Sequence, residues 1–193
     1  MLRAAQAHGM QAVAGAHALQ AVLLAVAAQD NAARLTASNQ FFNSRIVFTS
    51  DIQVWGLEDY WASPLEMLGK GRRDCEDYVI GKYFGLIAAG TPPTRLRLVY
   101  VRATLGHPGR AADAVLPHMV LAYSDAPGDD PLILDNLIND IRPASQRPDL
   151  VPVFSFNREG LWQGVGGRRV GDPLARLSRW PEVLAKAHAE GFQ

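Results

Sequence analysis

Patterns typical of helices occupy the first half of the chain, and patterns typical of strands dominate the second half. Apolar periodicity, capping residues and helix breakers predict helices over residues 10–37, 64–67 and 75–89, and a closing helix over residues 174–190. Alternating or β-branched runs predict strands over residues 96–102, 118–123, 132–135, 151–156 and 160–164, a short strand within 41–48, and a loop over 105–116. Helices followed by strands in this order predict an α+β fold with N-terminal helices and an antiparallel sheet.

The length and charge of the chain limit its organisation and its partners. A chain of 193 residues favours one domain over residues 1–193, with residues 1–37 as an N-terminal helical segment. The 19 Lys and Arg residues balance 19 Asp and Glu residues, so the formal net charge is zero. Because no net basic field attracts a polyanion, we expect no nucleic-acid partner.

The N-terminal segment is apolar enough to allow two interpretations. Residues 4–29 contain no Asp, Glu, Lys or Arg, and residues 21–28 are of the kind found in the core of a signal peptide. Gln11, His17 and Gln20 interrupt the apolar run, and its apolar positions suit a helix with one buried face. We favour a folded amphipathic helix over a signal peptide, and expect no insertion into a membrane, which needs about 20 mostly apolar residues.

Cys75 is the only cysteine, so the chain cannot form an internal disulfide. It lies at the expected start of a helix, where the helix dipole and free N–H groups favour a thiolate. His118 and Asp135 each lie at the edge of an expected strand. Cys, His and Asp in this order are the components of a thiol-nucleophile triad, although each residue alone could equally be a packing, strand or turn residue.

The expected hairpin places two of these residues near each other. Turn-forming residues 124–130 separate the strands predicted over 118–123 and 132–135. A turn centred near Ala126-Pro127 would put His118 directly opposite Asp135, with their Cβ atoms roughly 4.5–5.5 Å apart. The carboxylate could then orient the imidazole, whereas a slip of one residue would put the two side chains on opposite faces.

Three acidic residues, Asp74, Glu76 and Asp77, surround Cys75. Carboxylates this close raise the pKa of a thiol and oppose the thiolate, so we expect a positive charge to offset them.

Several groups could supply that offset or make it unnecessary. Arg72 and Arg73 precede the acids, and Asp74 could simply cap the helix with acids in its first turn. A calcium ion, which takes six to eight oxygen ligands, is the alternative, although the spacing is not that of an EF-hand. Zinc is less favoured than calcium, because one cysteine and scattered histidines match no usual zinc-ligand spacing.

A series of short motifs resembles a known family. The motifs are Phe41-Phe42-Asn43, Asp59-Tyr60-Trp61-Ala62-Ser63-Pro64-Leu65-Glu66, Asp74-Cys75-Glu76-Asp77-Tyr78, His118-Met119-Val120-Leu121, Leu134-Asp135-Asn136-Leu137, Ile141-Arg142-Pro143-Ala144-Ser145 and Pro152-Val153-Phe154-Ser155-Phe156-Asn157. Together they resemble the bacterial transglutaminase-like cysteine peptidases, the LapG-like family. The resemblance runs from about residue 10 to the C-terminus.

The resemblance implies a papain/transglutaminase-like fold and a periplasmic, calcium-dependent cysteine endopeptidase. It implies Cys75, His118 and Asp135 as nucleophile, base and orienting acid, and a calcium site at Asp74, Glu76 and Asp77. Such enzymes cut the N-terminal region of a large surface adhesin after an Ala-Ala type sequence and release cells from biofilm. An inner-membrane cyclic di-GMP receptor typically sequesters them through its periplasmic domain.

The sequence departs from the family pattern at two points, and alternatives to peptide hydrolysis also remain open. Arg73 stands where the family usually has glycine, and residues 10–36 resemble the mature first helix and leave no room for a signal peptide. The same triad would also suit an amidase or a transglutaminase-type acyl transfer on cell-wall or protein substrates. A non-catalytic binding module is the further alternative.

Overall fold

A seven-stranded sheet with strand order β6-β5-β4-β3-β7-β8-β9 forms the centre of the computed structural model, which describes residues 1–106 and 114–192. Neighbouring strands of this sheet are antiparallel. The strands are β3 (Leu96–Leu105), β4 (Ala114–Tyr123), β5 (Leu132–Leu134), β6 (Arg142–Pro143), β7 (Leu150–Phe156), β8 (Leu161–Gln163) and β9 (Arg169–Gly171).

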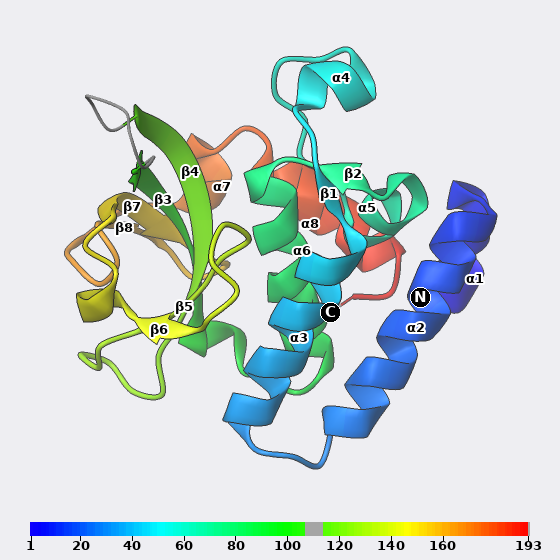
Figure 1. Ribbon diagram of the computed structural model, residues 1–193, viewed down its shortest axis with the longest axis horizontal. Coiled ribbons are helices and arrows are strands. Elements are labelled where there is room, and N and C mark those ends of the chain that lie inside the picture. Colours follow the sequence, from blue (N-terminus) through cyan, green and yellow to red (C-terminus); the bar gives the residue numbers. More distant parts are fainter. Residues whose placement is uncertain (107–113, 193) are drawn as a thin grey trace.

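The longer helices lie together on one side of this sheet (Figure 1). A short parallel pair, β1 (Val47–Phe48) with β2 (Arg72–Arg73), lies near the start of α6. The helices are α1 (Leu2–Ala5), α2 (Met10–Val26), α3 (Asn31–Arg45), α4 (Asp51–Trp55), α5 (Pro64–Lys70), α6 (Cys75–Ala88), α7 (Pro173–Arg176) and α8 (Trp180–Ala189), with short 3-10 turns at Gln6–His8, Pro93–Arg95 and Ala144–Gln146. This arrangement confirms the expected α+β fold.

The two faces of the sheet are buried unequally. The main core lies between the sheet and the helices, where side chains such as Tyr83, Leu98 and Leu121 are fully buried. A smaller cluster on the other face contains Val99 and Val120. Helix α6 packs against both α3 and β4, so the first residue of α6 is held close to the middle of the sheet.

Most predicted elements are confirmed, and three differ from expectation. Helix α3 continues to Arg45, beyond the expected helix end at residue 37, and the short strand expected within 41–48 is β1. Strand β4 begins at Ala114, inside the expected loop, and residues 107–113 of that loop lie outside the described part of the chain. The closing helix is divided into α7 and α8.

The apolar N-terminal stretch folds as α2, which packs against α5. Its buried side chains, Ala12, Ala16 and Leu19, share one face, so a folded helix with one buried face is confirmed. The apolar positions expected on that face are wrong, because Met10 and Leu24 are 90% and 70% exposed. Among residues 1–106 and 114–192, the helices are all too short or too polar to cross a bilayer.

Gly81 allows α3 to approach α6 closely. A Cβ atom at this position would lie 2.8 Å from Cε1 of the buried Phe42 ring. We therefore expect Gly81→Ala to lower the free energy of unfolding by about 1–3 kcal/mol through overpacking. Urea unfolding measures the change. The control is Gly166→Ala, whose added Cβ would have its nearest neighbour at 3.9 Å; equal stability of the two variants would contradict this account.

Candidate active site and metal centre

Cys75 is the first residue of α6 and is partly exposed. Its thiol donates a hydrogen bond to Oε2 of Glu76 at 3.0 Å. Burial raises the pKa of the Cys75 thiol well above its usual value, and the neighbouring Glu76 and Asp74 carboxylates raise it further. The backbone N–H of Met119, the residue that follows His118, faces the sulfur and opposes this rise. The thiol therefore lies beside the start of the buried part of β4.

His118 and Asp135 form a buried pair. Nε2 of His118 lies 2.8 Å from Oδ1 of Asp135, and the two side chains are 5% and 0% exposed. Arg147 donates to the other carboxylate oxygen at 2.7 Å, and the Leu137 N–H donates to Oδ1 at 3.1 Å. Burial alone would raise the pKa of Asp135, but the His118 and Arg147 partners outweigh it and lower this pKa to about 2. Asp135 is therefore ionised at neutral pH.

The expected hairpin register is wrong by two residues, although the expected contact forms. Direct opposition of His118 and Asp135 requires Leu121 to pair with Leu132, whereas Leu121 pairs with Leu134. An even shift keeps each side chain on its own face of the sheet, which is why the pair survives the error. Asp135 follows the last residue of β5 and reaches His118 diagonally.

The arrangement determines which nitrogen of His118 can react. Because Nε2 is held by Asp135, Nδ1 is the ring nitrogen free to exchange a proton with a thiol. The hydrogen bond of the Cys75 thiol goes to Glu76, and no thiol–imidazole hydrogen bond is formed among the described residues. Catalytic hydrogen bonds are often long before substrate binds, so this geometry is compatible with a Cys–His pair.

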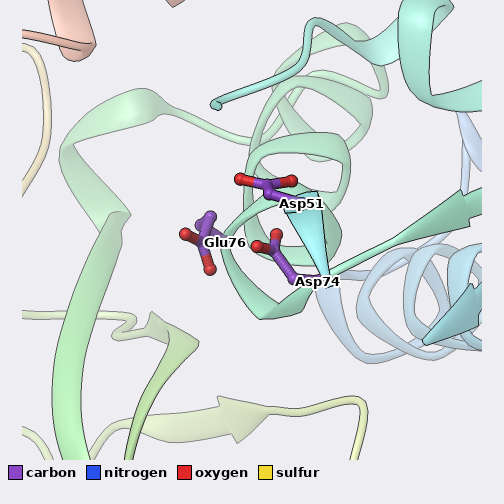
Figure 2. A group of neighbouring side chains, drawn as sticks. All are labelled: Asp51, Asp74 and Glu76. Carbon is purple, nitrogen blue, oxygen red and sulfur yellow. The ribbon is translucent and has the colours of Figure 1, made fainter. Parts of the chain in front are cut away.

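Three carboxylates meet next to the thiol. One oxygen each from Asp51, Asp74 and Glu76 lies within 4.8 Å of the others, and the side chains converge in Figure 2. Asp74 is the N-cap residue of α6 as expected, but its side chain makes no capping hydrogen bond. Buried Oδ1 atoms of Asp51 and Asp74 have no hydrogen-bond partner in the described part of the chain.

Negative charge on these three carboxylates is unfavourable, because they are buried or partly buried and close together, and Arg73 offsets the charge of Asp51 only in part. Burial and the nearby charges of Glu76, Asp77 and Asp51 raise the pKa of Asp74 to about 10. A carboxylate in this position needs either a shared proton or a cation, and unpartnered carboxylate oxygens are the ligands that calcium prefers. The residues present therefore fit a calcium ion at Asp51, Asp74 and Glu76.

Asp77 lies outside this group of carboxylates, contrary to the expected set of ligands. Its Oδ2 atom is 3.1 Å from Nε of Arg73, and both side chains are 0% exposed. The other oxygen accepts a hydrogen bond from the Ala62 N–H at 2.7 Å. Burial raises the pKa of Asp77, and the Arg73 guanidinium opposes that rise. The charge of Asp77 is therefore paired with the buried Arg73 guanidinium.

The position of Arg73 explains how the chain accommodates an arginine there. Its guanidinium lies over the Trp55 ring at 4.7 Å, and its NH1 group donates to the Arg72 carbonyl. Because the side chain is fully buried, it does not narrow the space around the thiol. Among the acids around Cys75, Arg73 therefore forms its ion pair with Asp77.

Sequence reasoning missed two residues of the site. Asp51 begins α4, far from Asp74 in the sequence, and only the parallel pairing of β1 with β2 brings the two together. Arg147 follows a 3-10 turn and binds Asp135 from the other side of the sheet. The pattern Asp-Ile-Gln-Val-Trp at residues 51–55 carries no ligand spacing that would have identified Asp51.

An apolar pocket of about 310 Å³ adjoins the His118 end of the site. Its lining includes Pro117, which precedes His118, and Tyr100, which pairs across the sheet with Met119. Leu116 and Phe154 form further parts of its wall.

Comparisons with known proteins agree with this site. The sequence profile of a family described as bacterial transglutaminase-like cysteine proteinase matches residues 12–168. The chain belongs to this family. Among solved structures, Legionella pneumophila LapG is 33% identical with a TM-score of 0.81, and the match covers 96% of this chain and 94% of that one. A comparison with curated protein sequences gives no match.

Two further LapG structures concern calcium. An EGTA-treated Legionella pneumophila LapG matches with a TM-score of 0.80 and 33% identity, over 96% of this chain and 95% of that one. A calcium-bound Legionella pneumophila LapG matches with a TM-score of 0.76 and 34% identity, over 94% of both chains. The transglutaminase-like cysteine proteinase fold is therefore shared over nearly the whole chain.

Proposed function

We propose that this family member is a calcium-dependent cysteine endopeptidase with Cys75 as nucleophile, His118 as base and Asp135 as orienting acid. The observation that carries the proposal is the placement of Cys75, at the start of α6, beside a β4 segment that holds the buried His118–Asp135 pair. Membership of a cysteine proteinase family supports a hydrolase. A purely structural thiol would not need a buried, charge-paired histidine on the strand segment that it faces.

In the proposed reaction, the Cys75 thiolate attacks the carbonyl carbon of the scissile peptide bond and forms a C–S bond. The His118 imidazolium gives its Nδ1 proton to the leaving nitrogen as the C–N bond breaks, which leaves a thioester. Neutral His118 then takes a proton from water while the water oxygen attacks the thioester carbon. The C–S bond breaks, and a carboxylic acid and the thiolate are released. Asp135 holds Nε2 throughout.

Asp51, Asp74 and Glu76 are the proposed calcium ligands. When bound, calcium would supply positive charge that offsets these carboxylates beside the thiol. The calcium-bound state of a 34% identical LapG supports this assignment. Glu76 is both a proposed calcium ligand and the acceptor of the Cys75 hydrogen bond. Binding of Glu76 to calcium would therefore compete with this hydrogen bond and release the thiol.

The proposed substrate is the N-terminal region of a large surface adhesin, cut at an Ala-Ala type sequence to release cells from biofilm. The apolar pocket lined by Leu116 and Pro117, the two residues before His118, supports a peptide substrate, because it could receive an apolar side chain of the peptide. We also propose a periplasmic location and restraint by the periplasmic domain of an inner-membrane cyclic di-GMP receptor, as the resemblance of the sequence motifs to the LapG-like family implies.

Mass spectrometry of a candidate adhesin fragment, incubated with the protein and calcium, tests the proposal. We expect two products whose summed mass exceeds that of the fragment by one water. Products that carry an added amine would instead indicate transglutaminase-type transfer by the same triad. An intact fragment that co-purifies with the protein would indicate a non-catalytic binding module.

The His118→Ala variant is the control for a contaminating protease. It should leave the fragment intact under the same conditions, because no base remains beside Cys75. Equal cleavage by both proteins would contradict the proposed function.

A further inference from the structure

Lys82 is a buried lysine on the helix that carries Cys75. Seven positions separate it from Cys75, which corresponds to two turns of α6, so the two side chains leave the helix in similar directions. The Lys82 side chain is 0% exposed, and its Nζ atom has no hydrogen-bond partner among the described residues. An unpaired buried amine is costly, which makes its presence two turns below the nucleophile notable.

The surroundings of Lys82 connect it to Asp135. Asp135 is the one charged group among the described residues that acts on its pKa. On its own helix, Tyr78 lies with its ring centroid 6.0 Å from Nζ. Helix α6 also packs against α3, which carries the neutral amides Asn39 and Asn43, and against β4, whose Met119 and Leu121 belong to the core between the sheet and the helices.

The segment that carries Asp135 is held from the same side by α3. Asn43 donates to the backbone carbonyl of Asp135 at 2.7 Å, and Asn39 donates to that of Asn139 at 2.8 Å. The Oδ1 atoms of Asn39, Asn43 and Asn136 are buried and lack hydrogen-bond partners within the described residues. The three amide oxygens are unpaired hydrogen-bond acceptors, and the Lys82 amine is an unpaired donor. All four groups lie on α3, on α6 or on the segment that carries Asp135.

We propose that Lys82 is a positioning residue for the catalytic pair, whose buried amine stabilises Asp135 from the helix side and so keeps the carboxylate on His118. This inference rests on the proposed proteolytic function. Arg147 binds one oxygen of Asp135 from the far face of the sheet, and Lys82 supplies positive charge from the opposite side. The chain keeps a costly buried lysine because the carboxylate it supports must stay fixed for the reaction.

The charge of Lys82 gives this role a pH dependence. Burial lowers the pKa of Lys82 to about 7, and Asp135 opposes that shift only in part. The amine is therefore charged below pH 7 and largely neutral above pH 8. Its support of Asp135 should be strongest on the acidic side of neutrality and weak in mild alkali.

The test compares Lys82→Met with the wild-type protein in calcium at pH 6 and pH 8.5. We expect kcat to fall roughly tenfold at pH 6, the size of a typical coupling between neighbouring groups, and much less at pH 8.5, with KM unchanged. The Tm at pH 6 should not fall, because methionine removes a buried charge without leaving a cavity. The control Lys70→Met, on α5, should change none of these values.

Three results would overturn the inference. They are an unchanged kcat at pH 6, an equal loss at both pH values, and a loss that only accompanies a lower Tm. If the wild type cleaves no substrate, the proposed function fails, and NMR of the His118 Nε2 proton still decides the role of Lys82. That proton, bound to Asp135, should exchange with solvent faster at pH 6 in Lys82→Met; equal exchange would contradict the role.

Discussion

Replacing Cys75 by alanine is expected to reduce kcat/KM for peptide cleavage by roughly a thousandfold or more, because loss of a nucleophile removes the covalent step altogether. The fold should persist, since Cys75 is partly exposed at the first residue of α6, and the side chain that its thiol binds within the described part of the chain is the adjacent Glu76. A fluorogenic peptide assay in excess calcium, with circular dichroism of each variant, measures both effects.

The residues of a triad act as a unit, and this property provides the control. The double variant Cys75→Ala with His118→Ala should be no slower than Cys75→Ala alone. His188→Ala, on the exposed side of α8, should retain wild-type kcat/KM. Additive losses from Cys75 and His118, or residual cleavage near the wild-type rate in Cys75→Ala, would refute the nucleophilic role.

Replacing Asp51 by asparagine should weaken calcium binding on the order of tenfold or more, because the site loses one of its charged oxygen ligands. Asparagine keeps an oxygen that can accept the hydrogen bond from the Tyr60 N–H, so α4 should stay in place. Isothermal titration calorimetry gives the dissociation constant. Peptidase activity should be recovered at higher calcium concentration, and chelation should abolish activity in both proteins.

Glu58→Gln is the matched control for this experiment. Glu58 lies in the exposed loop after α4 and is not part of the carboxylate group, so its removal should leave calcium affinity unchanged. Equal affinities for the Asp51→Asn and wild-type proteins would place the calcium site elsewhere. Full activity in excess chelator would remove the calcium requirement and leave the triad intact.

The elements that carry the catalytic residues were predictable because their signals are local. Asp74 at an N-cap, followed by an apolar stripe and then Gly90, is enough to define α6 with Cys75 at its start. The hairpin was predictable for a similar reason, since turn residues separate two alternating runs. Its register was not, because β5 is short and the loop before it is long, so nothing in the sequence fixes where pairing begins.

The metal site could be predicted only in part, because its ligands come from separate segments. The acids around Cys75 were visible in the sequence as a cluster, but tertiary contacts decide which of them lie in the carboxylate group and which form ion pairs. The buried Arg73 side chain forms an ion pair with Asp77, while the pairing of β1 with β2 places Asp51 next to Asp74. In the same way, burial of Phe42 against α6 extends α3 through residues whose local propensity suggested a strand.

The rate at which iodoacetamide alkylates Cys75, measured against pH in saturating calcium, tests the central claim most directly. If His118 promotes the thiolate, wild-type Cys75 should react rapidly at neutral pH, with an apparent pKa below the roughly 8.5 of a free thiol, and His118→Ala should react slowly there. Identical pH profiles for the wild type and His118→Ala would show that the imidazole does not act on the sulfur, and would contradict the account.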